Sequence, residues 1–93
     1  MNTLKAEKRD MSIKAKKLRR EGFVTGNLFG RELEASIPLK FDKAEIERLL
    51  KVESKGGQVM LEVAGETYDA LIKEVDYNPL KGYVDEIDFK RAF

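Results

Sequence analysis

The residues of this chain best suited to chemistry are basic, and they are concentrated in one short segment. The stretch "KAKKLRREG", residues 14 to 22, carries five basic side chains within seven positions, namely Lys14, Lys16, Lys17, Arg19 and Arg20. Ammonium and guanidinium groups at this density bind phosphate oxygens. A Lys- and Arg-rich helix is also often only a solvent-facing surface, so the density indicates an anionic partner without specifying it.

Residues suited to catalysis are scarce in the same sequence. There is no histidine and no cysteine, which removes the commonest bases and the thiol nucleophile. Glu86 and Asp88 alternate on a predicted strand and share one face, close enough to hold Mg²⁺ between them. Alternating acids on a strand are more often a solvated face, and no phosphate-binding glycine loop, zinc-ligand spacing or nucleophile motif occurs. We predict a protein that is not an enzyme and has no cofactor or metal, with a Mg²⁺-dependent hydrolase as an alternative.

Charge is distributed unevenly along the chain. Nine basic and three acidic residues lie in positions 1–31, a net +6, whereas nine basic and fourteen acidic residues follow, a net −5. The formal charge of +1 conceals this separation. Because a surface that serves only solubility usually mixes its signs, the separation favours a polyanionic partner for the first third of the chain.

Length and composition bound the class of protein. A chain of 93 residues has the size of one small domain, and we expect residues 1–93 to fold as a single unit. The absence of cysteine is typical of a cytosolic protein. The start "MNTLKAEKRD" is charged within five residues, and no apolar run has the length of a signal peptide core or a membrane span. We therefore expect a cytoplasmic protein with no membrane partner.

The basic segment is predicted to be helical. Met11, Ala15 and Leu18 recur at i, i+4 and i+7, the spacing that places apolar side chains on one stripe of a helix. Gly22 is expected to end this helix. Ile13 lies outside the stripe, so either the helix begins later or this side chain meets something other than the main core. The basic residues occupy nearly all of the remaining circumference.

A second helix has the clearest local signal in the sequence. Asp42 followed by Glu45 resembles a capping box, and Phe41 and Ile46 have the spacing of a hydrophobic staple. The helix should therefore begin at Asp42 and end at "ESKGG", residues 53–57. Its inward face would carry Ile46, Leu49 and Leu50.

The remaining elements are predicted to be strands. Apolar alternation and turn residues predict a first strand over residues 3–9 and two further strands over 23–30 and 34–41. A hairpin that turns at 64–66 is predicted over 58–75, and a last strand over 83–93. Within the second strand, Gly26-Asn27 indicates a bulge or a close backbone approach. About six short strands with two helices favour a mainly β, α+β domain built on a closed or partly closed barrel.

Several segments, in their order and spacing, resemble one known family. They are "LKAEKR", "KKLRREG", "LFG", "FDKAEIERLL", "VDYNPLKG" and "DEIDFKR". The chain resembles bacterial large ribosomal subunit protein 25, a family that includes the general stress protein Ctc and whose members bind 5S ribosomal RNA. The resemblance spans nearly all 93 residues. It implies a six-stranded closed β-barrel with two helices that binds loop E of 5S rRNA within the large ribosomal subunit.

The resemblance also implies an RNA-binding surface. Arg9 and the basic helix would meet phosphates and the minor groove, Phe29 falls on the family's RNA-facing aromatic position, and Lys73 and Asp88 fall on barrel positions at the RNA face. On the residues alone, an aromatic such as Phe29 is more often a core residue than an RNA-contacting one, and the fixing of a loop is an alternative role for Asp88. The predicted RNA-binding residues are Arg9, Lys14, Lys16, Lys17, Arg19, Arg20, Phe29, Lys73 and Asp88.

Two departures from the family pattern keep an alternative open. Glu86 stands where the family usually has a histidine, and Phe29 where it usually has a tyrosine. Carboxylates beside phosphate repel it unless a cation intervenes. The alternative is a stress-induced or non-ribosomal paralogue of the same fold that binds another acidic partner. In either case we expect a monomer when the protein is off the ribosome.

Overall fold

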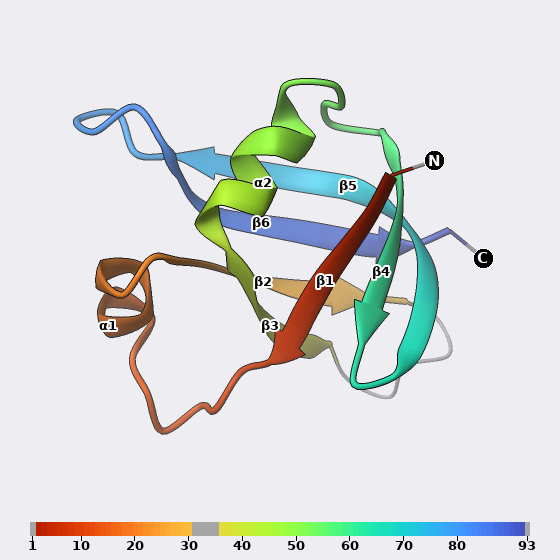
Figure 1. Cartoon of the computed structure of the whole chain (residues 1–93), viewed down its shortest axis with the longest axis horizontal. Helices are drawn as coiled ribbons and strands as arrows, with labels where there is room; N and C mark the ends of the chain where they lie inside the picture. The colour runs from red at the N-terminus through yellow and green to blue at the C-terminus, as the bar shows by residue number, and fades with distance from the viewer. Residues whose placement is uncertain (1, 31–35, 93) are drawn as a thin grey trace.

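The alternation of apolar and polar residues produces a barrel of six strands with two helices, seen in the computed structural model of the chain (Figure 1). The structure describes residues 2–30 and 36–92. Its elements are β1 (Asn2–Lys8), α1 (Ala15–Arg20), β2 (Phe23–Phe29), β3 (Ile37–Asp42), α2 (Lys43–Leu50), β4 (Gln58–Val63), β5 (Glu66–Tyr77) and β6 (Val84–Arg91).

The barrel closes through two parallel pairings that join distant parts of the chain. The strands follow one another around the barrel in the order β1-β3-β2-β6-β5-β4. Sequence neighbours β2 and β3, β4 and β5, and β5 and β6 pair antiparallel, as does β1 with β3. β1 pairs parallel with β4, and β2 with β6. The predicted mainly β closed barrel is confirmed; the start of the strand predicted over 34–41 lies outside the described residues.

Inward-facing residues of all six strands form one core. Leu4 of β1, Leu61 of β4 and Ile72 of β5 are among the residues that are almost completely buried. The rings of Phe41 and Phe89 lie 5.4 Å apart between centroids, in a tilted arrangement. Burying an aliphatic or aromatic side chain of this size stabilises the fold by about 1.5–3 kcal/mol. The core therefore holds the barrel together, and the outer face of the wall is left to charged residues.

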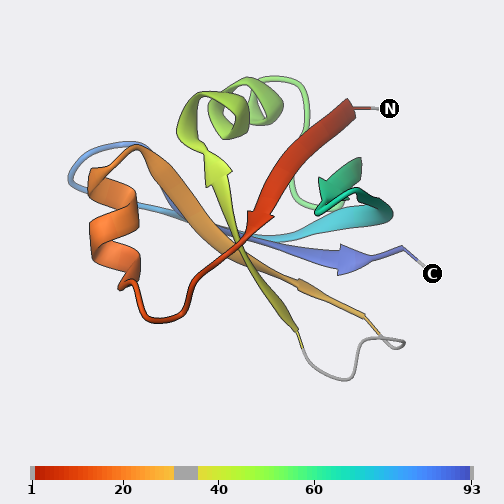
Figure 2. The same ribbon diagram turned by 60° about the horizontal axis from the view of Figure 1, so that its bottom comes forward.

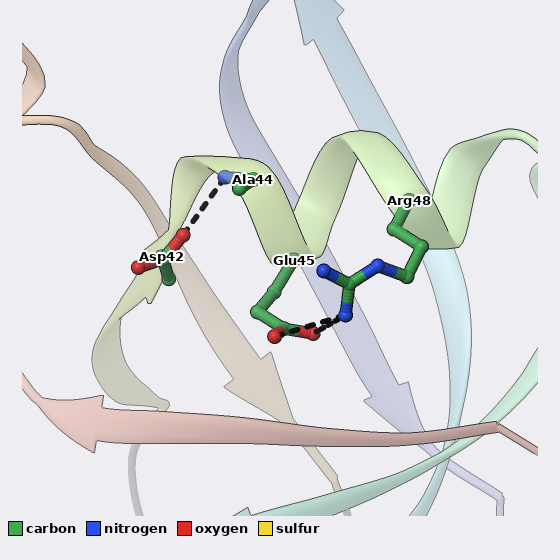
Figure 3. Close-up of polar contacts among 4 residues, drawn as sticks. All are labelled: Asp42, Ala44, Glu45 and Arg48. Atoms are coloured by element: carbon green, nitrogen blue, oxygen red, sulfur yellow. Dashed lines mark hydrogen bonds and ion pairs between the residues drawn. The ribbon is translucent and has the colours of Figure 1, made fainter.

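Helix α2 lies across one end of the barrel, above its opening in Figure 2. The Asp42 side chain accepts a hydrogen bond from the backbone N–H of Ala44 at 2.8 Å, as an N-cap does (Figure 3). The Glu45 carboxylate pairs with Arg48 at 3.0 Å instead of returning to the cap. The predicted start of this helix is confirmed. Its inward side chains Ile46 and Leu49 are buried in the barrel core.

Helix α1 is shorter than predicted and packs on the outside of the barrel, beside β2 (Figures 1 and 2). It begins at Ala15, which confirms the alternative that the helix begins later than Ile13. The inclusion of Met11 in its apolar stripe is wrong, because Met11 is 64% exposed and precedes the helix. Asp10 accepts hydrogen bonds from the backbone N–H and the hydroxyl of Ser12, which form a turn that competes with a helix there. Leu18 is buried, and Gly22, with φ of +95°, follows the last turn as expected.

The expected close approach at Gly26 is also confirmed. A Cβ atom at this position would collide with the backbone carbonyl oxygen of Ile87 on β6 and would lie 3.3 Å from the ring of Phe41. Only glycine lets β2 and β6 come this close.

No helix of the part that the structure describes is long and apolar enough to cross a bilayer.

Candidate RNA-binding surface

The basic residues of α1 lie on the surface and form no ion pair with another described residue. Lys14 is the N-cap residue of α1, and Lys16, Lys17 and Arg20 follow on the helix; all four are exposed. Within residues 2–30 and 36–92, the ion pairs are Lys40 with Glu7, Arg48 with Glu45 and Lys55 with Glu74. The α1 cations take part in none of them. Their charge is therefore available to an external anion.

Arg19 differs from its neighbours because its guanidinium donates hydrogen bonds to other parts of the protein. Its Nε donates to the backbone carbonyl of Asp85 on β6, and its Nη2 donates to the hydroxyl of Thr25 on β2, both at 3.2 Å. Thr25 faces outward by strand alternation, yet it is completely buried. The two hydrogen bonds of Arg19 therefore attach α1 to the outer face of the barrel. Arg19 thereby positions the exposed cations of α1. Its predicted contact with RNA stays a prediction.

We expect Arg19→Ala to lower the free energy of unfolding by about 2 kcal/mol, because two hydrogen bonds from a charged group are lost and the Thr25 hydroxyl is left unpaired. Urea unfolding followed by circular dichroism measures the change. Arg19→Lys serves as the comparison: one ammonium cannot reproduce the two divergent N–H groups, so it should recover less than half of the loss. Full recovery with lysine would contradict the positioning role.

Asp88 lies farther along the same outer wall and is also engaged internally. Its Oδ1 accepts from the backbone N–H of Asn27 at 3.1 Å and from the Asn27 side-chain amide at 3.4 Å. The carboxylate thus links β6 to β2. Its second oxygen, Oδ2, makes no hydrogen bond to the described residues. The alternative that Asp88 fixes a loop is therefore wrong about the element, because Asp88 holds the backbone of strand β2.

Phe29 and Lys73 meet at the far end of this wall. The Lys73 ammonium lies 4.3 Å from the centroid of the Phe29 ring, within the range of a cation–π contact. Phe29 is half-buried and lies outside the barrel core, so the alternative that it is a core residue is wrong. Thr25, Asn27 and Phe29 of β2 therefore form an outer strip that leads away from α1. We call these three residues the β2 strip.

Arg9 carries a donor without a partner. Its Nη2 donates to the backbone carbonyl of Ile13 at 3.3 Å, whereas its Nε is buried and has no hydrogen-bond partner among the described residues. A buried donor left unpaired costs free energy. Arg9 follows the end of β1, and β3 lies between β1 and β2 on the barrel wall.

Glu86 places a carboxylate within this basic surface. It pairs in register with Thr25 on β2 and with Asp76 on β5. Burial raises the pKa of Glu86, and the neighbouring carboxylates of Asp88 and Asp76 raise it further, while Arg19 and Arg9 act in the opposite direction. Glu86 thus places a carboxylate close to Arg19 and Arg9, where its ionised form would repel phosphate.

The raised pKa of Glu86 predicts a pH-dependent stability. A carboxyl whose pKa is higher in the folded than in the unfolded state stabilises the fold below its unfolded pKa, and this contribution is lost as the pH rises through the folded pKa. Glu86→Gln should therefore be as stable as the wild type near pH ~4 and more stable near pH ~7, by less than about 1 kcal/mol for a partly exposed group. Paired urea unfolding at the two pH values measures the difference. A variant no more stable at the higher pH would contradict it.

The structure adds residues that sequence reasoning missed. Helix α1 also borders a cleft. The rest of the cleft wall comes from the start of α2 and from the loop between β5 and β6. Lys43, Lys81 and Tyr83 line this cleft together with residues of α1. Lys81 belongs to the segment "VDYNPLKG", residues 75–82, whose Asn, Pro and Gly are typical of a turn. Among the described residues, no group of three or more acidic, His or Cys side chains is arranged to hold a metal ion.

These features define a small closed barrel with an external basic helix and an outer strip beside it. Residues 4–89 match the model of the Ribosomal L25p family, and the chain belongs to this family. It is 36% identical over 93 residues to the large ribosomal subunit protein bL25 of a Nostoc species, covering 94% of this chain and 91% of that protein. The resemblance seen in the sequence is confirmed.

Longer relatives match as well. The chain is 32% identical over 91 residues to the large ribosomal subunit protein bL25 of Caldanaerobacter subterraneus, which covers 97% of this chain and 46% of that protein. It is 28% identical over 92 residues to the general stress protein Ctc of Bacillus subtilis, covering 97% of this chain and 45% of that one. The chain therefore spans a little under half the length of these relatives.

Proposed function

We propose that this protein is a structural component of the large ribosomal subunit that binds loop E of 5S rRNA. Family membership supports the ribosomal assignment, since the relatives named above include large ribosomal subunit proteins. The observation that carries the RNA assignment is the set of exposed cations on α1, beside the β2 strip, that form no ion pair with another described residue. Ribosome association also puts the protein in the cytoplasm.

The proposed surface suits a distorted RNA helix. A-form RNA hides its base edges in a deep, narrow major groove and presents hydroxyls and phosphates across a shallow minor groove. The α1 cations Lys14, Lys16, Lys17 and Arg20 would neutralise phosphates, and the guanidinium of Arg9 would donate a further hydrogen bond to a phosphate oxygen. Asp88, through its free oxygen, and the Phe29–Lys73 pair would contact the groove beside them.

Titration of 5S rRNA at several salt concentrations tests this function. If four or five phosphates are neutralised, log K should fall with log salt at a slope of roughly −3 to −4.5, from about 0.7–0.9 per contact. A duplex RNA of the same length without loop E is the control, and it should bind more weakly. Equal affinity for both RNAs would contradict the recognition of loop E. A slope near zero would contradict binding to the RNA backbone.

Glu86 and the similarity to Ctc favour a second candidate, a stress-induced or non-ribosomal paralogue that binds another acidic partner. Ribosome fractionation separates the two, because a protein found only outside the large subunit during growth would support the paralogue.

We also propose that residues 1–93 form one domain and that the free protein is monomeric. Barrel closure leaves no unpaired edge among the described strands for another copy to extend. Sedimentation equilibrium tests the monomer.

A further inference from the structure

A second group of cations converges on a cleft at the end of α1. The cleft has a volume of about 650 Å³ and lies between α1, the first residue of α2 and the loop between β5 and β6. In Figures 1 and 2, α1 and this loop project on the same side of the barrel. We call it the basic cleft, after the five cations that line it: Lys16, Arg19, Arg20, Lys43 and Lys81.

The walls of the basic cleft are held in place by local hydrogen bonds. Lys16 and Arg20 are four residues apart and share one face of α1. The carbonyl of Gly22, just after α1, accepts from the backbone N–H of Lys43 at 3.1 Å, which joins the end of α1 to the start of α2. In the loop, the side-chain oxygen of Asn78 accepts from the backbone N–H of Lys81 at 3.1 Å. The cations are therefore presented by backbone that is already ordered.

The positive charge in the basic cleft is only partly compensated by the described residues, since five cations face one acid. Its one acid there is Asp85, whose carboxylate accepts from the side-chain amide of Asn78 at 3.2 Å. The ammonium of Lys43 lies 3.6 Å from the centroid of the Tyr83 ring, and that of Lys81 lies 5.8 Å from the same centroid. The aromatic ring gathers the two lysines without neutralising them. Cations brought together in this way repel one another until an anion enters.

We propose that the basic cleft binds consecutive phosphates of an RNA strand and thereby extends the RNA-binding surface from α1 to α2 and the β5–β6 loop. The inference rests on the proposed RNA-binding function. An RNA backbone is favoured over a compact anion because the cleft cations continue the exposed cations of α1, which form a path longer than one phosphate group. The new contacts are those of Lys43 and Lys81.

The test compares two double variants in titrations of a 5S rRNA transcript. Lys43→Gln with Lys81→Gln removes two charges from the cleft, and Lys5→Gln with Lys51→Gln removes two charges from exposed lysines elsewhere. The cleft variant should flatten the slope of log K against log salt by about 1.4–1.8 and weaken binding about 20-fold near 0.15 M salt, at 0.7–0.9 per lost contact. The control variant should change the slope little. Thermal unfolding verifies that both are folded.

A footprint on the unmodified protein gives a second readout. Acetylation of lysines by an activated ester, followed by mass spectrometry, should slow at Lys43 and Lys81 when 5S rRNA is present and stay unchanged at Lys5. If the wild type binds with a steep salt slope but neither readout involves the cleft, this inference fails and the proposed function stands. If the wild type does not bind 5S rRNA, both fail.

Discussion

Replacing Gly26 with alanine is expected to lower the free energy of unfolding by about 3 kcal/mol, a large share of the 5–15 kcal/mol typical of a domain. The added Cβ would collide with the carbonyl oxygen of Ile87, a backbone atom that cannot rotate away as a side chain does. β2 and β6 would have to separate, which weakens the parallel pairing that includes Thr25 and Glu86. Denaturant unfolding of purified protein measures the loss.

Gly65 is the matched control for this substitution. It has φ of +84° at the tip of the hairpin between β4 and β5, and a Cβ atom there would meet nothing within 4 Å. Alanine at Gly65 should therefore cost only the strain of left-handed backbone, about 1–2 kcal/mol. If Gly26→Ala were no more harmful than Gly65→Ala, the close approach of β2 and β6 would be contradicted.

The second large effect concerns RNA affinity. Lys16→Ala combined with Lys17→Ala should weaken binding to 5S rRNA about 20-fold near 0.15 M salt, since each lost phosphate contact contributes about 0.7–0.9 to the salt slope. The free energy of unfolding should change by no more than about 0.5 kcal/mol, because both side chains are exposed and unpaired in the described structure. Fluorescence anisotropy of labelled RNA measures the affinity.

Lys5→Ala combined with Lys51→Ala is the control for net charge. Both lysines are exposed and lie away from α1, on β1 and just after α2. This pair should leave the slope nearly unchanged. An equal loss of affinity in both double variants would show that general charge, rather than the position of the α1 cations, determines binding.

Local sequence signals were sufficient wherever a structural element is determined by residues within a few positions. The alternation of Leu4 and Ala6 predicted β1, and Asp42 with Phe41 predicted the start of α2. Such signals depend on periodicity and capping, which act over one turn or one strand. The inclusion of Met11 in the apolar stripe of α1 was wrong for a related reason: the turn of Asp10 with Ser12 occupies the positions where that stripe would begin.

The candidate surface was only partly predictable. The density of charge in residues 14–20 indicated an anion-binding helix, and its exposed cations are consistent with that. Arg19 could not be distinguished from its neighbours, because its partners Thr25 and Asp85 are chosen by packing. Lys43 and Lys81 lie in the part of the chain with net negative charge, so composition directed attention away from them.

The amino-acid sequence by itself determined the strands, the capped helix, the placement of the early positive charge and the family. The tertiary structure decided the parallel pairings of β1 with β4 and of β2 with β6, the internal role of Arg19 and the convergence of distant lysines on one cleft. The physical reason is range. Periodicity and capping act between near neighbours, whereas barrel closure brings together groups more than 60 positions apart, such as Arg19 and Asp85.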